Sequence, residues 1–162
     1  MFFGELRARH ILESGIKGNR MENLFKHSLP IQLRFNDADT LGHINNSVYL
    51  NFYDLGKTSY FQTICGETLV PSDIDVVVAH IEVDFLSPIF LTDSVEVQTT
   101  VEKIGNKSFT LLQRIVCCDT EQVKCICRTV MVGFDLKTNE SKPISDRWRN
   151  AIIRYENRND LI

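Results

Sequence analysis

The fold is decided by residues 30–64, which read PIQLRFNDADTLGHINNSVYLNFYDLGKTSYFQTI. Apolar and polar residues alternate from Ile31 to Asn36, which is the period of a half-buried strand. After a polar stretch, aromatic and apolar residues recur in steps of three and four, which predicts a helix of roughly four turns from about Asn46 to Ile64. Gly56 lies inside this helix, where it costs up to about 1 kcal/mol relative to Ala, so we interpret it as a point of close packing.

The second half of the chain is typical of a β-sheet. Runs of β-branched residues and alternating patterns predict strands at Val76–Phe85, 95–102, Ser108–Cys118 and Val123–Phe134. Gly105-Asn106 and residues 119–121 are turn signals between three of them, and Asp146–Tyr155 is a candidate terminal helix. Strands joined by tight turns are antiparallel, because parallel neighbours need a long crossover. The sequence therefore predicts an α+β fold in which an antiparallel sheet wraps one long helix.

Length and charge limit the classes of function. The 162 residues suit one domain, and 43% hydrophobic with 24% charged residues is the balance of a globular chain. The 18 Lys and Arg against 21 Asp and Glu give a net charge of −3, which argues against a strongly basic nucleic-acid-binding protein. No stretch approaches the length of apolar sequence that a membrane-spanning helix needs, so we expect no membrane span.

The N-terminal residues differ from the rest, and we predict an extension at residues 1–20, with a short helix, before a main domain at 21–162. Charged residues follow Met1 closely, so we expect no secretory signal peptide. The odd number of cysteines, five, then indicates reduced thiols, buried as small hydrophobic side chains, and a cytoplasmic protein.

Chemistry concentrates at the junction between the first strand and the long helix. Residues 37–46 bring together two carboxylates, an imidazole and two amides. The start of a helix leaves backbone N–H groups unpaired and carries a partial positive charge, which suits a developing oxyanion. A carboxylate just before it serves as a general base or a nucleophile. The junction is thus typical of a site that polarises a carbonyl group and delivers water to it.

Three other interpretations of this junction stay open. Asp and Asn before a helix are common caps, and His43 then makes ordinary hydrogen bonds. Asp37, Asp39 and His43 are also a possible set of ligands for a divalent metal, although no second cluster supplies further ligands, and we expect no metal site. Residues 37–40 fit the Asp-x-Asp-x-Thr pattern of haloacid-dehalogenase-type phosphatases, but that family places it after a buried parallel strand.

The junction resembles the opening motif of hotdog-fold acyl-CoA thioesterases of the 4-hydroxybenzoyl-CoA thioesterase type, Asp-x-Asp-x-x-Gly-His-x-Asn-Asn-x-x-Tyr. The matching residues are Asp37, Asp39, Gly42, His43, Asn45, Asn46 and Tyr49. Residues 81–93, with Pro88 and Asp93, and Ser108 after the predicted hairpin turn are also similar to this family. The resemblance covers about residues 28–135 and implies the hotdog fold, an antiparallel sheet wrapped around one long central helix.

The resemblance further implies hydrolysis of an acyl-CoA thioester to a free acid and CoA, with CoA as part of the substrate and no other cofactor. Asp39 would activate water or attack the carbonyl carbon itself. The backbone N–H near Asn46 would polarise the carbonyl oxygen, and His43 would orient substrate or water. We expect Asp37, Gly42, Asn45 and Tyr49 to line the substrate-binding surface. Asp37 and Asp39 would titrate as a coupled pair if the strand continued through them.

The helix departs from the family pattern. Asp54 and Lys57 stand where the family commonly has Glu and Arg. Asp54 is therefore a second candidate base on the substrate-binding surface, and the alternative is a solvated ion pair with Lys57. The aromatic side chains at Tyr49, Phe52, Tyr53 and Phe61 are either walls of an acyl slot or ordinary core.

The partners follow from the same resemblance. Hotdog enzymes work as homodimers or homotetramers with the acyl tunnel between subunits, so we expect a homo-oligomer. Candidate cations for the CoA phosphates are Lys57, Lys103, Lys107 and Arg128. Two alternatives are a hotdog domain acting on acyl carrier protein thioesters and a non-hydrolytic acyl-CoA-binding module. The presence of Asp39 favours hydrolysis, because binding alone does not need a carboxylate beside the helix start.

Overall fold

A computed structural model describes residues 24–66, 70, 74–158 and 160–161. The predicted extension at residues 1–20, with its helix, lies outside these described residues. In chain order, the elements are β1 His27–Ile31, the 3-10 turn η2 Phe35–Asp37, α2 Asn46–Cys65, β2 Val76–Phe85, β3 Val95–Ile104, β4 Ser108–Cys117, β5 Val123–Asp135, β6 Glu140–Ser141 and α3 Asp146–Glu156.

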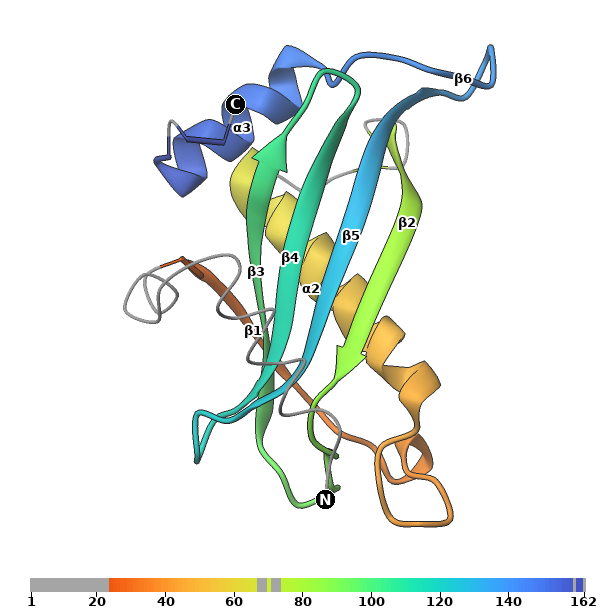
Figure 1. Cartoon of the computed structure of the whole chain (residues 1–162), viewed down its shortest axis with the longest axis vertical. Helices are drawn as coiled ribbons and strands as arrows, with labels where there is room; N and C mark the ends of the chain where they lie inside the picture. The colour runs from red at the N-terminus through yellow and green to blue at the C-terminus, as the bar shows by residue number, and fades with distance from the viewer. Residues whose placement is uncertain (1–23, 67–69, 71–73, 159, 162) are drawn as a thin grey trace.

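The strands form one antiparallel sheet in the order β1-β3-β4-β5-β2, and the short β6 pairs with β5. The long helix α2 lies across one face of this sheet, and α3 lies near one end of it (Figure 1). The predicted α+β architecture, with an antiparallel sheet around one long helix, is confirmed. The boundaries of the four long strands and the two helices agree with the sequence-based prediction to within a few residues.

The first strand lies further toward the N-terminus than the alternation from Ile31 to Asn36 predicted. It ends at Ile31, and Phe35 lies in a 3-10 turn with 85% of its surface exposed. The reason is local: an Asp37 carboxylate oxygen accepts the N–H of Arg34 at 2.8 Å, and the Asp37 N–H donates to the Arg34 carbonyl oxygen at 2.9 Å. Asp side chains commonly compete with strand pairing in this way. The condition for Asp37 and Asp39 to share one strand face, a strand that continues through them, is therefore not met.

Both ends of α2 carry residues suited to helix termini. The Asn45 side chain accepts the N–H of Ser47 at 3.0 Å, which satisfies one of the unpaired donors at the helix start. Gly66 ends the helix in the left-handed region, at φ +70°, and its N–H donates to the Gln62 carbonyl oxygen at 3.0 Å. Along its length the helix buries one face against the sheet, made of Tyr49, Phe52, Tyr53, Gly56, Tyr60, Phe61 and Ile64.

Gly56 is the point where the helix backbone lies closest to the sheet. A Cβ atom at this position would lie 2.5 Å from Cγ1 of Val97 and 3.1 Å from Nε2 of Gln113. Both neighbours are buried, so neither has open space to move into. The prediction that Gly56 is a close-packing point is confirmed.

The buried side chains form two clusters along α2. One surrounds the first half of the helix and includes Ile44, Ile89 and Val97. The other surrounds its second half, where α3 contributes Trp148 and Ile152. The cysteines differ in exposure: Cys117, Cys125 and Cys127 are buried, Cys65 is half-buried and Cys118 is exposed. The expectation that all five are buried is wrong for Cys118, which lies beyond the end of β4 at a turn, and Cys65 meets it only in part.

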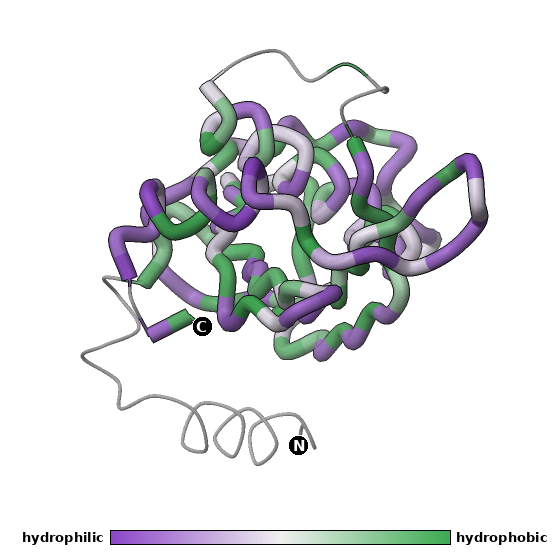
Figure 2. The backbone as a smooth tube through the Cα atoms, turned by 90° about the horizontal axis from the view of Figure 1, so that it is seen from above, coloured by the Kyte–Doolittle hydropathy of each residue, from purple (hydrophilic) through white to green (hydrophobic). Residues whose placement is uncertain are grey.

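Hydrophobic and hydrophilic residues alternate along the traced chain, without one long hydrophobic segment (Figure 2). Within the described residues, no helix combines the length and the hydropathy needed to cross a membrane.

A buried carboxyl group joins α3 to α2 and β3. Glu156 is 1% exposed; the Tyr60 hydroxyl donates to its Oε1 at 2.6 Å and the Thr100 hydroxyl to its Oε2 at 3.1 Å. Burial raises the pKa of Glu156 above its ordinary value, and the two hydroxyl donors oppose this shift.

Replacing Gly56 by Ala should destabilise the protein by about 1–3 kcal/mol, the usual cost of overpacking a well-packed core. Urea denaturation at a fixed protein concentration measures this loss. The control is Thr58→Ala, an exposed change on the same helix that should stay within about 0.5 kcal/mol of the wild type. Equal stability of the two variants would show that α2 does not lie as close to Val97 as described.

Glu156 should make stability depend on pH. Because its folded-state pKa lies above the ordinary 4.5, its contribution is fully present below 4.5 and is lost as pH rises through the folded-state pKa. Glu156→Gln removes this titration. The free energy of unfolding of the wild type minus that of Glu156→Gln should therefore decrease as pH rises above 4.5, measured by urea denaturation from about pH 4 to about pH 8.

The control for this pH series is Glu140→Gln, a change at an exposed carboxylate on β6. The difference in free energy of unfolding between the wild type and Glu140→Gln should vary little over the same pH range. A difference for Glu156→Gln that is equally flat would contradict a buried, proton-binding carboxyl group at this position.

Candidate active site

The segment between β1 and α2 folds back on itself and is held against the rest of the domain. The N–H of Asp39 donates to the His43 carbonyl oxygen at 2.7 Å, and the N–H of Asn45 donates to the Asp37 carbonyl oxygen at 2.8 Å. The N–H of Ile44 donates to the Ile89 carbonyl oxygen at 2.8 Å, and the Ile44 side chain is buried. These bonds bring the polar residues of the motif together at the start of α2.

Asp39 is half-buried and has an ordered carboxylate. Its Oδ1 accepts the N–H of Leu41 at 2.8 Å and the N–H of His43 at 3.2 Å. Gly42, at φ +78°, provides the left-handed residue that this tight turn requires. No described residue hydrogen-bonds Oδ2. One oxygen of Asp39 therefore organises the turn, and the other is available to a reacting group.

The start of α2 presents a free donor. The Asn45 side chain accepts both the N–H of Ser47, at 3.0 Å, and its hydroxyl group, at 2.9 Å, while the N–H of Val48 donates to the Asn45 carbonyl oxygen at 2.9 Å. The N–H of Asn46 has no acceptor among the described residues. The capping interpretation is thus correct for Asn45, and the backbone N–H of Asn46 is the donor that remains for a ligand.

His43 contacts the segment that follows β2. Its ring lies edge-on to the ring of Phe90, with centroids 5.0 Å apart, and residues 43 and 90 form an isolated β-bridge. The side chain is half-buried. His43 therefore lies in the same turn as Asp39, and its backbone is what touches the Asp39 carboxylate.

Asp37 has a different environment from Asp39. Its Oδ2 accepts the N–H of Arg34 at 2.8 Å, so this carboxylate closes the 3-10 turn before the motif. The coupled titration expected for Asp37 and Asp39 rested on a continuous strand, which the structure does not contain. Among the described residues, no group of three His, Cys, Asp or Glu side chains is arranged to hold a metal ion, so the geometry gives the metal interpretation no support.

Tyr49 is part of the core in the single chain. It is 2% exposed, and its hydroxyl oxygen accepts the N–H of Ile89 at 3.2 Å. Burial raises the pKa of Tyr49 to about 12. Phe52, Tyr53 and Phe61, the other candidate walls of an acyl slot, are also buried, so the core interpretation describes the single chain.

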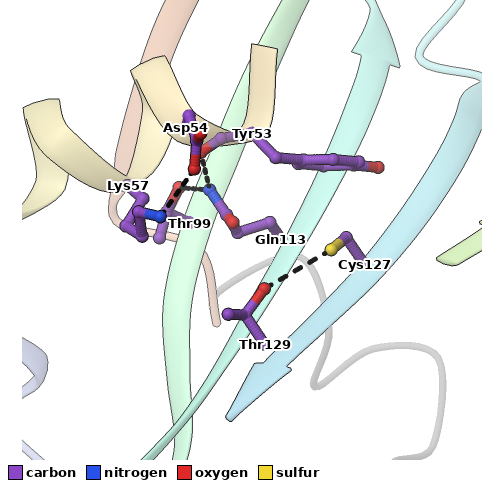
Figure 3. A network of polar contacts seen from close by, with 7 residues as sticks. All are labelled: Tyr53, Asp54, Lys57, Thr99, Gln113, Cys127 and Thr129. Carbon is purple, nitrogen blue, oxygen red and sulfur yellow. Dashed lines mark hydrogen bonds and ion pairs between the residues drawn. The ribbon is translucent and has the colours of Figure 1, made fainter. Parts of the chain in front are cut away.

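Asp54 forms the predicted ion pair. Its carboxylate lies 2.6 Å from the Lys57 ammonium group, and 69% of its side chain is exposed (Figure 3). An exposed Asp54 paired with Lys57, three residues further along the same helix, is the arrangement that the alternative interpretation described. Asp54 lies two turns beyond the helix start, and the structure does not bring it into the turn that holds Asp39.

The sequence-based reasoning missed two features of this region. The first is the Ile89–Phe90 backbone, which holds both Ile44 and the Tyr49 hydroxyl; the Asp93 carboxylate accepts the N–H of Phe90 at 3.0 Å and keeps this turn in place. Pro88 and Asp93 in the sequence were the available signal. The second is the hydroxyl group of Tyr53, which is buried without a hydrogen-bond partner among the described residues.

The candidate cations for the CoA phosphates are spread over the surface. Lys57 pairs with Asp54, Arg128 with Glu102 at 3.2 Å, and the Lys107 ammonium group donates to the Ser141 hydroxyl at 3.2 Å. A surface hollow of about 620 Å³ lies on the sheet face opposite α2, next to Gln98, Arg114 and Cys118, and no motif residue lines it. We therefore place the candidate site at the turn and not at this hollow.

Comparisons with known proteins agree with this geometry. The family model described as "Thioesterase-like superfamily" matches residues 33–152. The acyl-CoA thioester hydrolase YbgC of Escherichia coli O6:H1 is 26% identical over 89 residues, which are 54% of this chain and 66% of YbgC, just under two thirds of its length. The long-chain acyl-CoA thioesterase FadM of Escherichia coli K12 is 24% identical over 123 residues, covering 75% of this chain and 93% of FadM.

A solved structure is similar over most of the chain. It is a thioesterase from Thermus thermophilus complexed with coenzyme A and Zn, with a TM-score of 0.73 and 29% sequence identity. The alignment covers 83% of this chain and 97% of that protein. With a family model that matches residues 33–152 and with the antiparallel sheet around α2, the chain belongs to the thioesterase-like superfamily and has its hotdog fold.

Proposed function

We propose that this protein hydrolyses an acyl-CoA thioester to a free carboxylic acid and CoA. The observation that carries the proposal is that one hydrogen-bonded turn carries two groups without a partner among the described residues, the Oδ2 of Asp39 and the backbone N–H of Asn46. The names of YbgC and FadM and the CoA bound to the Thermus enzyme support the choice of acyl-CoA as substrate.

The Asn46 N–H would donate a hydrogen bond to the thioester carbonyl oxygen. This bond strengthens as negative charge develops on that oxygen, and the positive end of the α2 dipole adds to the effect. Because the donor is part of the helix backbone, it needs no rearrangement when the substrate binds. His43 and the exposed Asn45 would line the same surface, while Gly42 gives the turn its shape.

Asp39 would supply the reacting oxygen or activate it. As a general base, its Oδ2 takes a proton from water while the water oxygen attacks the carbonyl carbon; the carbon–sulfur bond then breaks, and the CoA thiolate takes up the proton. As a nucleophile, Oδ2 attacks the carbonyl carbon, releases the CoA thiolate and forms a mixed anhydride, which water then cleaves. Neither route needs a cofactor beyond the CoA portion of the substrate.

We also propose that the protein works as a homodimer or homotetramer. β2 is at an edge of the sheet, is ten residues long and exposes Val77, Val78, Ile81 and Phe85 by 37–45% of their surfaces. A long apolar edge strand pairs readily with another strand, so a second copy is a fitting partner. The proposed compartment is the cytoplasm, where the free thiols would stay reduced.

Asp39→Asn should lower kcat by about 10²–10⁴-fold, the usual contribution of a positioned general base. The Asn side-chain oxygen can still accept the N–H groups of Leu41 and His43, so the turn should be kept. The measurement is thiol release from a panel of acyl-CoAs. The control is Asp54→Asn, which removes an exposed carboxylate of the same type and should leave most of the activity.

Two results would contradict these roles. Turnover of Asp39→Asn near the wild-type rate would remove Asp39 from the chemistry. A larger loss in Asp54→Asn than in Asp39→Asn would move the base to the helix. If no acyl-CoA is cleaved by the wild type, thioesters of acyl carrier protein and calorimetric binding of acyl-CoA test the two alternative functions.

Val77→Lys should shift the protein from dimer or tetramer to monomer, because it places like charges on both copies of a paired edge strand. Light scattering coupled to size exclusion gives the molar mass of each form. The control is Thr58→Lys on the exposed side of α2, away from the edge. A wild-type protein that is monomeric, or a Val77→Lys variant that stays oligomeric, would exclude β2 as the interface.

A further inference from the structure

Three tyrosines of α2 are buried, and their hydroxyl groups differ in how they are satisfied. The Tyr49 hydroxyl accepts the N–H of Ile89, and the Tyr60 hydroxyl donates to Glu156. The Tyr53 hydroxyl has no hydrogen-bond partner among the described residues, although Tyr53 is only 3% exposed. Because buried hydroxyl groups nearly always have a partner, this one calls for a physical explanation.

The other polar groups around Tyr53 do not satisfy its hydroxyl. Gln113 donates from its amide nitrogen to the Tyr53 carbonyl oxygen at 3.0 Å and to the Thr99 hydroxyl at 3.1 Å. The Cys127 sulfur lies 3.5 Å from the Thr129 hydroxyl oxygen (Figure 3). The Cys125 thiol is the one group that interacts with the Tyr53 hydroxyl, but sulfur is only a weak acceptor, and the hydroxyl has no oxygen or nitrogen partner among the described residues. Burial, with these nearby thiols, raises the pKa of Tyr53 well above its ordinary value, so the group is a neutral O–H donor.

Tyr53 belongs to the same buried cluster as Cys125 and Cys127, and Val83 of β2 packs against this cluster. Cys125 and Cys127 of β5 pair directly with Phe85 and Val83 of β2, so these four side chains share the sheet face that α2 covers. The Phe85 ring contacts the Tyr49 ring, with centroids 5.1 Å apart. We call the surface formed by Tyr49, Tyr53, Ile81, Val83 and Phe85 the α2–β2 strip.

Part of the α2–β2 strip is uncovered. Phe85 is 45% exposed and Ile81 is 43% exposed, although both point to the helix side of the sheet. Apolar surface of this kind fits the hydrocarbon part of an acyl chain. The strip begins at Tyr49, less than one turn after the Asn46 N–H that would hold the thioester.

The position of Tyr53 along the helix shows which part of an acyl chain would meet it. Tyr53 lies seven residues after Asn46, which is about 10 Å along a helix with a rise of about 1.5 Å per residue. A chain that starts at the Asn46 N–H and follows the α2–β2 strip therefore reaches Tyr53 several carbons away from its thioester group.

Resting on the proposed function, we infer that the Tyr53 hydroxyl is a specificity-determining group, which selects acyl chains that carry a hydroxyl or oxo oxygen several carbons from the thioester. Such an oxygen accepts a stronger hydrogen bond from the Tyr53 hydroxyl than the Cys125 sulfur does. A plain hydrocarbon chain of the same length would keep the Tyr53 hydroxyl buried without an oxygen or nitrogen partner. Sites built to bond a polar substituent discriminate strongly against the analogue that lacks it.

The test compares kcat/KM for two matched series of acyl-CoAs, hexanoyl to dodecanoyl, and the same chains with a terminal hydroxyl group. For at least one chain length, the wild-type kcat/KM should be about tenfold or more higher for the hydroxylated chain than for the plain chain. Tyr53→Phe should bring this ratio close to one, mainly because the hydroxylated chain loses its hydrogen bond and is hydrolysed less well. The control is Tyr60→Phe, which removes a buried hydroxyl of the same helix that Glu156 already satisfies, and it should keep the wild-type ratio.

The outcomes separate this inference from the proposed function. A ratio that is the same in the wild type and Tyr53→Phe, or a wild-type preference for the plain chain at every length, overturns the role of Tyr53 while hydrolysis stands. A change of molar mass in Tyr53→Phe without a change in the ratio would instead assign the hydroxyl to the contact between subunits.

If the wild type cleaves neither series, the proposed function fails, and binding still tests Tyr53. Calorimetry with uncleavable thioether analogues of the two series should then give a preference for the hydroxylated analogue that Tyr53→Phe loses. Equal binding of both analogues by both proteins would overturn the inference.

Discussion

The contact of Gly56 with Val97 and Gln113 sets the distance between α2 and the sheet, and the candidate site depends on that distance. Gly56 is near the middle of the helix, so the helix axis cannot move away from β3 and β4 without opening the core on both sides. Since the interior of a protein is packed as densely as a crystal, such a gap would be costly. The first turn of α2 is therefore held in one place relative to the strands.

The start of the helix must also meet the turn that carries Asp39, and a second set of bonds ensures this. Ile44 is buried next to the helix and is bonded to Ile89, and Ile89 in turn is bonded to the Tyr49 hydroxyl. Asp39 uses one oxygen to hold this turn and leaves the other available. A carboxylate fixed by backbone donors is well positioned without relying on any other charged side chain.

The open side of the domain is the side of β2. The helix α2 packs against β1 and β3. On the same face of the sheet, Ile81 and Phe85 of β2 remain partly exposed. The same edge thus offers a place for a second copy and, through the α2–β2 strip, a route for an acyl chain. In a homo-oligomer these two uses need not compete, since a partner at the edge of β2 would close the strip from outside.

The order of the elements could be predicted from the sequence, because hydrophobic period and turn residues are local signals. The patterns at Val76–Phe85 and Ser108–Cys117 and the helix periodicity from Asn46 predicted these elements within a few residues. The motif also located Asp39 next to a helix start, since both lie within ten residues of each other in the chain. The local pattern failed at Phe35, where Asp37 bonds the backbone of Arg34 and ends the strand that alternation alone would continue.

Which polar groups are paired and which remain free follows from contacts between distant parts of the chain. That Asn45 is a cap while the Asn46 N–H stays available depends on the exact path of the turn, which the distant Ile89 holds. The three buried tyrosines of α2 are alike in the sequence, and their different environments come from Ile89, Glu156 and the thiols of β5. Hydrogen-bond satisfaction is set by neighbours that are far apart in the chain, so no local pattern records it.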